Sequence, residues 1–565
     1  MAKTLRKITL SGRAKWLVKP RKHRDIVDQL LVNRGVDLAQ KQAFLEADFN
    51  TGLFDPYLLP DMDKAVKRII RAVETGEKVG IFADYDADGT PGAALLYKTF
   101  TKIGLRSEVF IPTREDGYGL SQKGIDHLVG KGCRVIVTVD LGIRNETEAV
   151  YCQNQKVDLI ITDHHLIGDE IPRAFAVINP KLVNSKYPFP DLCGCGVAYK
   201  LVWALSKHYP KISESFLKWN LDLAAISTIS DVVPLISENR VIAKYGLCVL
   251  RKTRNKGLRH LYRFAGIDPA AINTYAVGFQ IGPRINTPGR IDRATKSFDL
   301  LVSDESAQLI SLAGWLNAKN VERQRAMEKL YAEAEAIIEE EDLSKKKIIV
   351  VDGDWNKGIL GPPASQLAEK YHRPVILFAR AGEEYHGSAR SISGVNIIDI
   401  LEKVGHLTLK FGGHAGAAGI TVAKSGYRRF CDGVALVSDQ AISESKLVPS
   451  MGIDCELSAD EMTPDTVNKI AQMEPFGLGN PKPMFALMGV LIKNPRFVGN
   501  DRQHFSALVE KGKFSFKAII FNCQIEESII QSNILYDIIF YLEIDSWNGH
   551  NRVSLNVVDL REHRE

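Results

Sequence analysis

The chain has 565 residues, of which 45% are hydrophobic and 25% are charged. This length exceeds what one hydrophobic core usually supports, so it predicts three or four domains, and the balance of residue types excludes a disordered chain. No stretch approaches the roughly 20 consecutive apolar residues of a membrane-spanning helix, and the basic start lacks the apolar core of a secretory signal, so we expect a cytoplasmic protein.

Charge and cysteine content give weaker indications. The net charge of +5 is the difference between 73 basic and 68 acidic residues, so it says little about a polyanionic partner. The first 24 residues hold nine Lys or Arg and no acid, which suits either phosphate contact or a solvated tail. Eight cysteines are sparse and predict free thiols in a reducing compartment. Cys193 and Cys195 lie close together but lack two further ligands at the spacing of a zinc site.

After an N-terminal region with a helical stretch ending in FLEADF, the pattern alternates between strands and helices. The apolar segments 79–83, 135–139 and 159–162 predict buried strands, and amphipathic stretches such as 64–77 predict helices. This alternation predicts a mostly parallel sheet covered by helices. Ligands gather at the carboxyl ends of such strands, where the sequence places Asp84, Asp140 and Asp163.

Residues 303–341 are rich in Ala, Leu, Glu, Arg and Gln without Pro, which predicts a long helix and a domain boundary after it. A second α/β unit is expected to open with a strand at 348–351 and to carry a glycine-rich loop, FGGHAGAAG, at 411–419. Beyond residue 447, short strands separated by Gly, Asn and Pro predict a small β-barrel. Their sequences are MFALMGVLIK, HFSALVE, FKAIIFN, DIIFYLEI and RVSLNVVDL.

The segment DYDADG places Asp84, Asp86 and Asp88 between a predicted strand and a helix. Alternate residues of a strand-end loop can converge on one point, and carboxylate oxygens suit Mg²⁺ or Mn²⁺. A solvated turn that caps the next helix is the simpler alternative. A calcium loop is disfavoured because the Glu required at its twelfth position is missing.

Three further segments contain polar residues beside apolar runs. Asp163-His164-His165 ends a strand, Asp140 follows another in TVDLG, and Asp231 follows an apolar helical stretch. Burial of Asp231 would be costly unless it is paired or binds a metal. Together these residues favour a site of oxygen and nitrogen ligands for two divalent ions, for which phosphodiester hydrolysis is the first reaction to consider.

Arginines lie among Gly, Pro and Asn in several segments, where phosphate could approach the main chain. Salt bridges between domains are the alternative, which we favour for Arg323. In the glycine-rich loop, His414 would be a polar contact for a phosphate or a base. The other candidates for substrate contact are Arg114, Arg284, Arg290, Gln324 and Arg390.

DYDADG, TVDLG, TDHH and SDVVP, in this order, resemble motifs I to IV of the DHH phosphoesterases, and GSARS with FGGHAGAAG resembles the associated DHHA1 domain. REDGYGLS, GPRINTPGR, LNAKNVERQ and MEPFGLGNPKPMF narrow the resemblance to the RecJ branch of the family, bacterial single-strand-specific 5′→3′ exonucleases. The resemblance implies an α/β chain in which a parallel-sheet DHH domain is joined by a long helix to an α/β DHHA1 domain, followed by a C-terminal β-barrel of the OB-fold type. The implied parts are an N-terminal region (1–55), the DHH catalytic domain (56–302), the connecting helix (303–342), the DHHA1 domain (343–446) and the OB-fold DNA-binding domain (447–565).

The resemblance also implies roles for single residues. The implied ligands of two Mn²⁺ or Mg²⁺ ions are Asp84, Asp86, Asp140, His164 and Asp231, with Asp163 and His165 as further catalytic residues. The implied contacts to DNA and to its 5′ end are Arg114, Arg284, Arg290, Gln324, Ser388, Arg390 and His414. The implied function is hydrolysis of single-stranded DNA to 5′-mononucleotides in DNA repair and recombination. A helicase and a single-strand-binding protein are candidate partners of a chain expected to be monomeric.

Two alternatives remain at this level. One is a phosphodiesterase for short oligonucleotides or cyclic dinucleotides, or a pyrophosphatase, against which the presence of residues 447–565 argues. The other is a non-catalytic replication scaffold, against which the intact ligand set argues. The chain departs from the common family pattern at Thr90-Pro91-Gly92, Leu141 and Gly361-Pro362-Pro363, but no metal-site position is lost.

Overall fold

A computed structural model of the chain describes residues 14–113, 117, 119–291, 295–499, 504–521, 530–531, 533–545 and 552–564. It contains two compact units. The first consists of Ala39–Val321 together with Met473–Pro481. The second consists of the described residues before Ala39, Glu322–Gln472 and the described residues from Lys482 onward. No described helix is both long enough and apolar enough to cross a membrane.

The first unit is built on a five-stranded sheet in the order β3-β2-β4-β5-β6, in which all neighbours are parallel. The strands are β2 (Lys78–Ala83), β3 (Ser107–Phe110), β4 (Cys133–Val139), β5 (Asp158–Thr162) and β6 (Ala176–Ile178). The three predicted strands and the parallel sheet are therefore confirmed. Because the strands are parallel, their carboxyl ends meet at one edge of the sheet.

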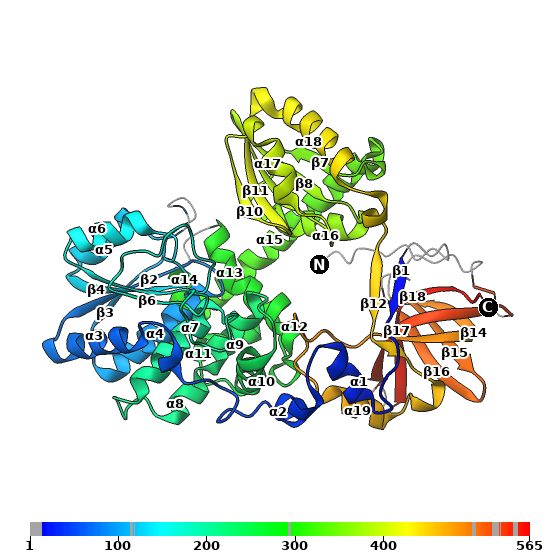
Figure 1. The fold of residues 1–565 in the computed structure, drawn as a ribbon, viewed down its shortest axis with the longest axis horizontal. Coiled ribbons are helices and arrows are strands. Elements are labelled where there is room, and N and C mark those ends of the chain that lie inside the picture. Colours follow the sequence, from blue (N-terminus) through cyan, green and yellow to red (C-terminus); the bar gives the residue numbers. More distant parts are fainter. Residues whose placement is uncertain are drawn as a thin grey trace. The chain divides into compact units, whose positions relative to one another are not determined.

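Helices cover both faces of this sheet (Figure 1). On one face lie α3 (Met62–Thr75), α4 (Gly89–Ile103) and α7 (Gly194–Ser206), and on the other lie α5 (Gln122–Gly130) and α6 (Glu146–Asn154). Successive side chains alternate between the two cores: Ile81 packs with the first group of helices and Phe82 with the second. The sheet is thus buried on both sides, as its continuous apolar strands predict.

The rest of the first unit is helical. It contains α2 (Lys41–Glu46), α8 (Glu214–Trp219), α9 (Leu221–Ser230), α10 (Ser237–Arg251), α11 (Lys256–Ala265), α12 (Thr274–Ala276), the π-helical turn η5 (Val277–Ile281), α13 (Gly282–Ile291) and α14 (Thr295–Val302). The buried guanidinium of Arg240 on α10 donates to the backbone oxygens of Phe44, Met473 and Glu474. These bonds join segments far apart in sequence to the body of the unit.

The predicted long helix is confirmed as α15 (Ser306–Glu340). Leu309, Ala313 and Leu316 near its start belong to the core of the parallel-sheet unit. Leu330 and Ala334, nearer its end, belong to the core that covers the second sheet. One helix therefore contributes side chains to both units.

The second unit contains a mixed sheet in the order β10-β11-β9-β8-β7, in which only β7 and β8 are parallel. Its strands are β7 (Ile349–Gly353), β8 (Val375–Ala381), β9 (Glu384–Arg390), β10 (Lys410–His414) and β11 (Ala417–Ala423); its helices are α16 (Gly361–Tyr371), α17 (Ile397–Lys403) and α18 (Tyr427–Ala441). The prediction of a glycine-rich loop at 411–419 was wrong. These residues form an antiparallel hairpin, and only Ala415 and Gly416 connect its strands.

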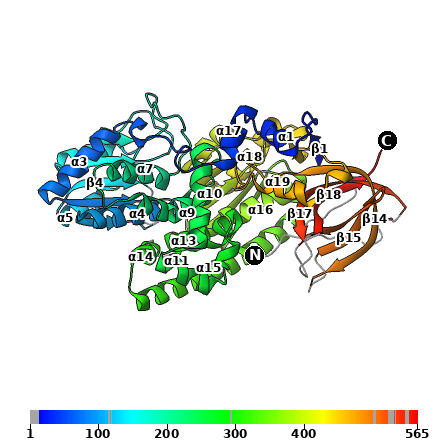
Figure 2. The same ribbon diagram turned by 90° about the horizontal axis from the view of Figure 1, so that it is seen from below.

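The predicted C-terminal barrel is confirmed (Figures 1 and 2). It consists of β14 (Phe485–Val498), β15 (His504–Lys511), β16 (Phe514–Ile520), β17 (Leu535–Asp545) and β18 (Arg552–Glu562). Pairing of β14 with β17 closes it. The flanking elements are α1 (Ile26–Asn33), α19 (Pro464–Ala471), β13 (Cys455–Glu456) and a parallel pair of β1 (Lys15–Val18) with β12 (Ser450–Ile453). Trp16 on β1 donates its indole N–H to Asp559 on β18 at 2.9 Å, which holds this pair against the barrel.

Candidate metal centre

The loop after β2 carries the first group of carboxylates. The carboxylate oxygen of Asp86 accepts the backbone N–H groups of Asp88 and Gly89 at 2.8 and 2.9 Å, so it caps the start of α4. Asp84 is buried, and its Oδ1 makes no hydrogen bond within the described part of the chain. Gly89 is required here because a Cβ would lie 2.5 Å from the backbone oxygen of Asp84. The loop therefore closes tightly and leaves the Asp84 carboxylate aimed inward.

Asp88 has a different role from its neighbours. Its two carboxylate oxygens accept the backbone N–H groups of Gly194 and Cys195 at 2.6 and 2.7 Å. These N–H groups are the first of α7 and have no partner within the helix, so the aspartate satisfies them and complements the helix dipole. Asp88 thereby fixes the α7 N-terminus to the loop after β2.

Asp140 lies immediately after β4 in a left-handed backbone conformation, with φ 64°. It is buried, and its Oδ1 makes no hydrogen bond with any described residue. A side chain at position 194 would place its Cβ 2.5 Å from the Cβ of Asp140, so Gly194 allows α7 to start directly against this carboxylate. The backbone is strained at the point where the carboxylate enters the site.

Asp163 positions the two histidines that follow it. Its Oδ1 accepts the backbone N–H groups of His164 and His165 and faces His165 Nδ1 at 2.8 Å, while its Oδ2 accepts the N–H of Ile143 at 2.9 Å. Burial alone would raise the pKa of Asp163, but these bonds lower it, so the group is an ionised acceptor. His165 Nδ1 therefore carries a proton that points to Asp163, and this contact also helps to raise the pKa of His165.

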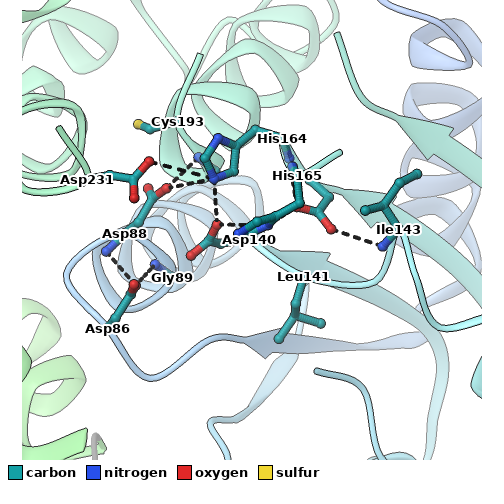
Figure 3. A network of polar contacts seen from close by, with 12 residues as sticks. Asp86, Asp88, Gly89, Asp140, Leu141, Ile143, His164, His165, Cys193 and Asp231 are labelled. Carbon is teal, nitrogen blue, oxygen red and sulfur yellow. Dashed lines mark hydrogen bonds and ion pairs between the residues drawn. The ribbon is translucent and has the colours of Figure 1, made fainter. Parts of the chain in front are cut away.

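His164 brings the carboxylates together. Its Nε2 lies 3.1 Å from Asp140 Oδ1, 3.7 Å from Asp231 Oδ2 and 3.8 Å from Asp88 Oδ2 (Figure 3). Burial lowers the pKa of His164 to about 3, so the imidazole is neutral at physiological pH and can act as a ligand. Asp231, the C-cap of α9, has a side chain 29% exposed, and the His165 side chain is 40% exposed, so the cluster is accessible at these two residues.

The carboxylates destabilise one another in the absence of a cation. Burial, followed by the charges of neighbouring aspartates, raises the pKa values of Asp84 and Asp140 well above the ordinary range. The same causes raise the pKa of Asp88 to about 6 and that of Asp231 to about 8. A divalent cation would offset this repulsion.

The donor atoms fit such a cation. The donor atoms form three sets, and the atoms within each set lie no more than 4.8 Å apart. The sets are Asp84, Asp86 and Asp140; Asp88, His164 and Asp231; and Asp140, His164 and His165. Asp84 Oδ1, Asp140 Oδ1 and His164 Nε2 are buried and make no hydrogen bond with described residues. Carboxylates combined with neutral imidazole suit Mn²⁺ or Mg²⁺. The predicted ligands Asp84, Asp86, Asp140, His164 and Asp231 thus converge, and Asp88 joins them as a candidate that the sequence-based ligand set omitted.

The departures from the family pattern leave this cluster intact. Thr90, Pro91 and Gly92 are buried in the first turn of α4, where the N–H that proline lacks would have no partner within the helix. A side chain at position 92 would place its Cβ 2.5 Å from Val139 Cγ1, so Gly92 allows α4 to pack on the sheet. Leu141 is buried in the apolar core on the other side of the sheet.

The structure separates the predicted substrate residues into groups. Arg284, on α13 in the first unit, donates from Nη1 to Gln280 O at 2.7 Å and from Nε to Asn317 Oδ1 at 3.0 Å. Arg114 and the side chain of Arg290 lie outside the described residues. The second unit holds the others: Gln324 and Arg323 on α15, Ser388 and Arg390 on β9, and His414 on β10.

Ser388 and Arg390 form a polar cluster at the start of α16. Arg390 donates from Nη1 to Ser388 Oγ and from Nε to Ser365 Oγ, both at 3.1 Å. Its Nη2 lies 2.5 Å from the position that a Cβ on Gly361 would take. The strand register places Arg390 and His414 on either side of Ala417, so both side chains lie on the same face of the sheet.

Family models match three parts of the chain: "DHH family, N-terminal domain" at residues 78–228, "DHHA1 domain" at 345–437 and "RecJ OB domain" at 453–559. The chain is 33% identical over 538 residues to the single-stranded-DNA-specific exonuclease RecJ of Bacillus subtilis, covering 94% of this chain and 67% of that protein. It is 32% identical to the Dickeya dadantii protein of the same description, covering 95% and 96% of the two chains.

The solved structures give the same relationship. The crystal structure of Thermus thermophilus RecJ in complex with Mn²⁺ superposes with a TM-score of 0.83 at 27% identity, covering 98% of this chain and 80% of that one. The Mg²⁺ complex of the same protein gives a TM-score of 0.77 at 25% identity, with coverage of 98% and 79%. The similarity therefore extends through both units rather than through one domain.

Proposed function

Because the chain belongs to the RecJ family of single-stranded-DNA-specific exonucleases, we propose that it degrades single-stranded DNA from the 5′ end to 5′-mononucleotides. The chain is a metal-dependent phosphodiesterase. One observation carries the assignment of its centre: Asp84, Asp140, His164 and Asp231 come from four separate segments, yet their donor atoms meet at one edge of the sheet.

We propose that the centre holds two Mn²⁺ or Mg²⁺ ions. The support is that Asp140 and His164 each belong to two of the three donor sets, so they can serve neighbouring ions. Two such ions would activate a water molecule, neutralise the scissile phosphate and stabilise the leaving oxygen.

The protein's own groups position the reactants around this centre. Asp163 fixes the ring of His165, which can then support the centre or face the scissile phosphate. Asp88 fixes the α7 N-terminus and with it the close approach of Gly194 to Asp140. Asp231 and His165, whose side chains are 29% and 40% exposed, lie where a phosphate can enter.

The 5′ end is proposed to bind in the second unit, at Arg390, Ser388 and Ser365. An arginine flanked by two hydroxyls suits a terminal phosphate. Gly412 and Gly419, in register with Ser388, have open space where side chains would otherwise stand, so a nucleotide can approach the sheet. His414, on the same face as Arg390, would be a further contact.

We further propose that each domain predicted from the sequence has its own function. Residues 56–302 would cleave the strand, residues 343–446 would bind its 5′ end, and residues 447–565 would bind the rest of the single strand. The support for the last is that the RecJ OB domain model matches within it, and OB-folds hold single strands by charge and stacking. A role in DNA repair and recombination, with a helicase and a single-strand-binding protein as partners, follows from the same proposal.

The test is to incubate the protein and Mn²⁺ with a single strand labelled at either end. The proposal predicts that the 5′ label is released at once as a mononucleotide, whereas the 3′ label shortens gradually. Release from the 3′ end, cleavage of duplex at an equal rate, or preference for cyclic dinucleotides would contradict it.

A further inference from the structure

Two exposed aromatic rings lie on α12 and the following π-helical turn η5 of the first unit. Tyr275 and Phe279 are 55% and 50% exposed. Their centroids are 4.9 Å apart and their planes differ by 26°, so the rings are stacked and nearly parallel. Scattered exposed apolar residues are ordinary, but two stacked rings present a flat aromatic surface to solvent.

The backbone that carries these rings is held in an unusual conformation. Phe279 lies in the π-helical turn η5, in which the N–H of Gly282 donates to Val277 O, five residues earlier. Arg284 Nη1 donates to Gln280 O in the same turn at 2.7 Å. Single π-helical turns occur frequently at functional sites, where they change the direction of a side chain. Here the turn precedes α13 and holds the ring of Phe279 outward.

This turn is packed directly against the end of the helix that carries Asp231. A Cβ on Gly282 would lie 2.3 Å from Ser230 Oγ, so the backbone of the turn touches the residue before Asp231. At its other end, α13 meets the loop after β2, where a Cβ on Gly289 would lie 2.6 Å from Tyr85 O. Residues 282–289 therefore run from the residue before Asp231 to the loop that carries Asp84 and Asp86.

The segment is accessible at several positions. Tyr275 and Phe279 are exposed, and Gly278, Gln280, Pro283 and Asn286 are half-buried. The Oδ1 of Asn286 makes no hydrogen bond with any described residue. Eleven residues of helix span about 16 Å, the length of several nucleotides of a single strand. The segment thus runs from the two rings, past the end of α9, to the loop after β2.

We propose that Tyr275 and Phe279 form a stacking platform for the bases of the single strand that the metal centre cleaves. This inference rests on the proposed function and adds a contact to bases rather than to phosphates. A base is the occupant that fits because the surface is flat, aromatic and exposed. Stacking is tolerant of sequence, which suits an enzyme that must pass every base.

The test compares Phe279→Ala with Phe279→Trp on single strands that carry abasic sites at successive positions from the 5′ end. Loss of one base–aromatic stack corresponds to a rise in KM of roughly 5- to 100-fold, which we expect for Phe279→Ala on an intact strand, with kcat little changed. Phe279→Trp keeps an aromatic surface and should stay near the wild-type KM. On the strand whose abasic site lies at the platform, the KM of wild type should rise to that of Phe279→Ala. The KM of the variant should not rise further on this strand.

Phe264→Ala is the matched control, because Phe264 is also an exposed phenylalanine of the first unit, 45% exposed on α11. Its KM should not change. If Phe279→Ala has the wild-type KM, or if its KM rises further by the same factor on every abasic strand, the platform proposal is wrong. Either result would leave the proposed exonuclease activity unaffected. If wild type itself cleaves no single strand, the proposed function fails first and the platform with it. Equal melting temperatures of all variants establish that folding is preserved.

Discussion

His164 Nε2 lies 3.1 Å from Asp140 Oδ1, although the two residues follow different strands of the sheet. Burial keeps His164 neutral, with a pKa of about 3, and raises the pKa of Asp140. The geometry brings a nitrogen and a carboxylate oxygen together without a hydrogen bond between them. Such a pair is expected where both atoms bind a cation.

Metal binding should stabilise the protein more at pH 8 than at pH 6. Burial and neighbouring charges raise the pKa of Asp231 to about 8 and that of Asp88 to about 6, from an ordinary value of 3.8. Between about pH 4 and 8 these two carboxyl groups therefore bind more protons in the folded metal-free protein than in the unfolded chain, so their contribution to stability falls as pH rises. Mn²⁺ needs the ionised carboxylates, so its binding competes with protons.

The measurement is the melting temperature with and without Mn²⁺ at both pH values. The rise caused by Mn²⁺ should be larger at pH 8, and KCl at the same ionic strength should cause no comparable rise. An equal or smaller rise at pH 8 would mean that these carboxylates do not bind the metal.

Asp163→Asn should reduce kcat by about 10- to 100-fold, the usual effect of removing a group that orients a residue of a metal site. The negatively charged Asp163 accepts a hydrogen bond from His165 Nδ1–H and helps to raise the pKa of His165. The neutral amide of the variant lacks this charge. The acid limb of the pH–rate profile should therefore shift if His165 takes part in cleavage. An unchanged kcat and profile, with melting temperature preserved, would remove Asp163 from the catalytic set.

Arg390→Ala should abolish a preference for 5′-phosphorylated over 5′-hydroxyl strands, and Arg390→Lys should restore it only in part, because lysine cannot contact a phosphate bidentately. Pro362 and Pro363 lack N–H groups, so the first turn of α16 offers fewer donors to an anion and Arg390 carries more of the binding. The measurement is KM for the two kinds of strand. Arg380→Ala, in the same sheet but paired with Asp352, is the control and should keep the preference. Retention of the preference in Arg390→Ala would place the 5′-end site elsewhere.

Glu238→Gln should lower the free energy of unfolding by about 3 kcal/mol or more without changing the kcat of folded protein. Glu238 pairs with Lys200, accepts the hydroxyl of Tyr187 and accepts the N–H of Phe54 at 2.6 Å, and the side chains of both charged partners have no exposure to solvent. Removing the charge leaves the Lys200 ammonium buried without its partner.

Denaturant unfolding of the single variant and of Lys200→Met combined with Glu238→Leu checks this effect. The double variant should recover part of the stability because no unpaired charge remains. A double variant less stable than the single one would contradict the role assigned to the pair.

The sheet and most of the metal centre could be predicted because the determining signals are local. Asp84, Asp140 and Asp163 each follow an apolar strand directly, and parallel strands bring such residues to one edge. The barrel was likewise evident from short alternating strands with turn residues between them. Sequence patterns of this kind report on neighbours a few positions away.

What escaped prediction depends on contacts between distant segments. Asp88 is bonded to Gly194 and Cys195, more than a hundred positions later, and nothing in DYDADG distinguishes it from its neighbours. The glycines at 411–419 predict a loop because glycine is a poor strand former. The structure has a hairpin there, because β11 also pairs with β9 on its other side, which stabilises the strand conformation. The exposed stack of Tyr275 on Phe279 lies at the π-helical turn, and hydrophobic periodicity in the sequence does not predict such a turn.

The most direct test of the account is the number of Mn²⁺ ions bound by wild type and by Asp140→Asn, measured by equilibrium dialysis on samples whose cleavage of single-stranded DNA is assayed in parallel. Asp140 belongs to two of the donor sets, so its loss should disturb both ions. We predict two ions per wild-type chain, at most one in the variant, and at least about a hundredfold lower cleavage. A variant that binds as many ions as wild type and cleaves as fast would contradict the assignment of this cluster as the catalytic metal centre.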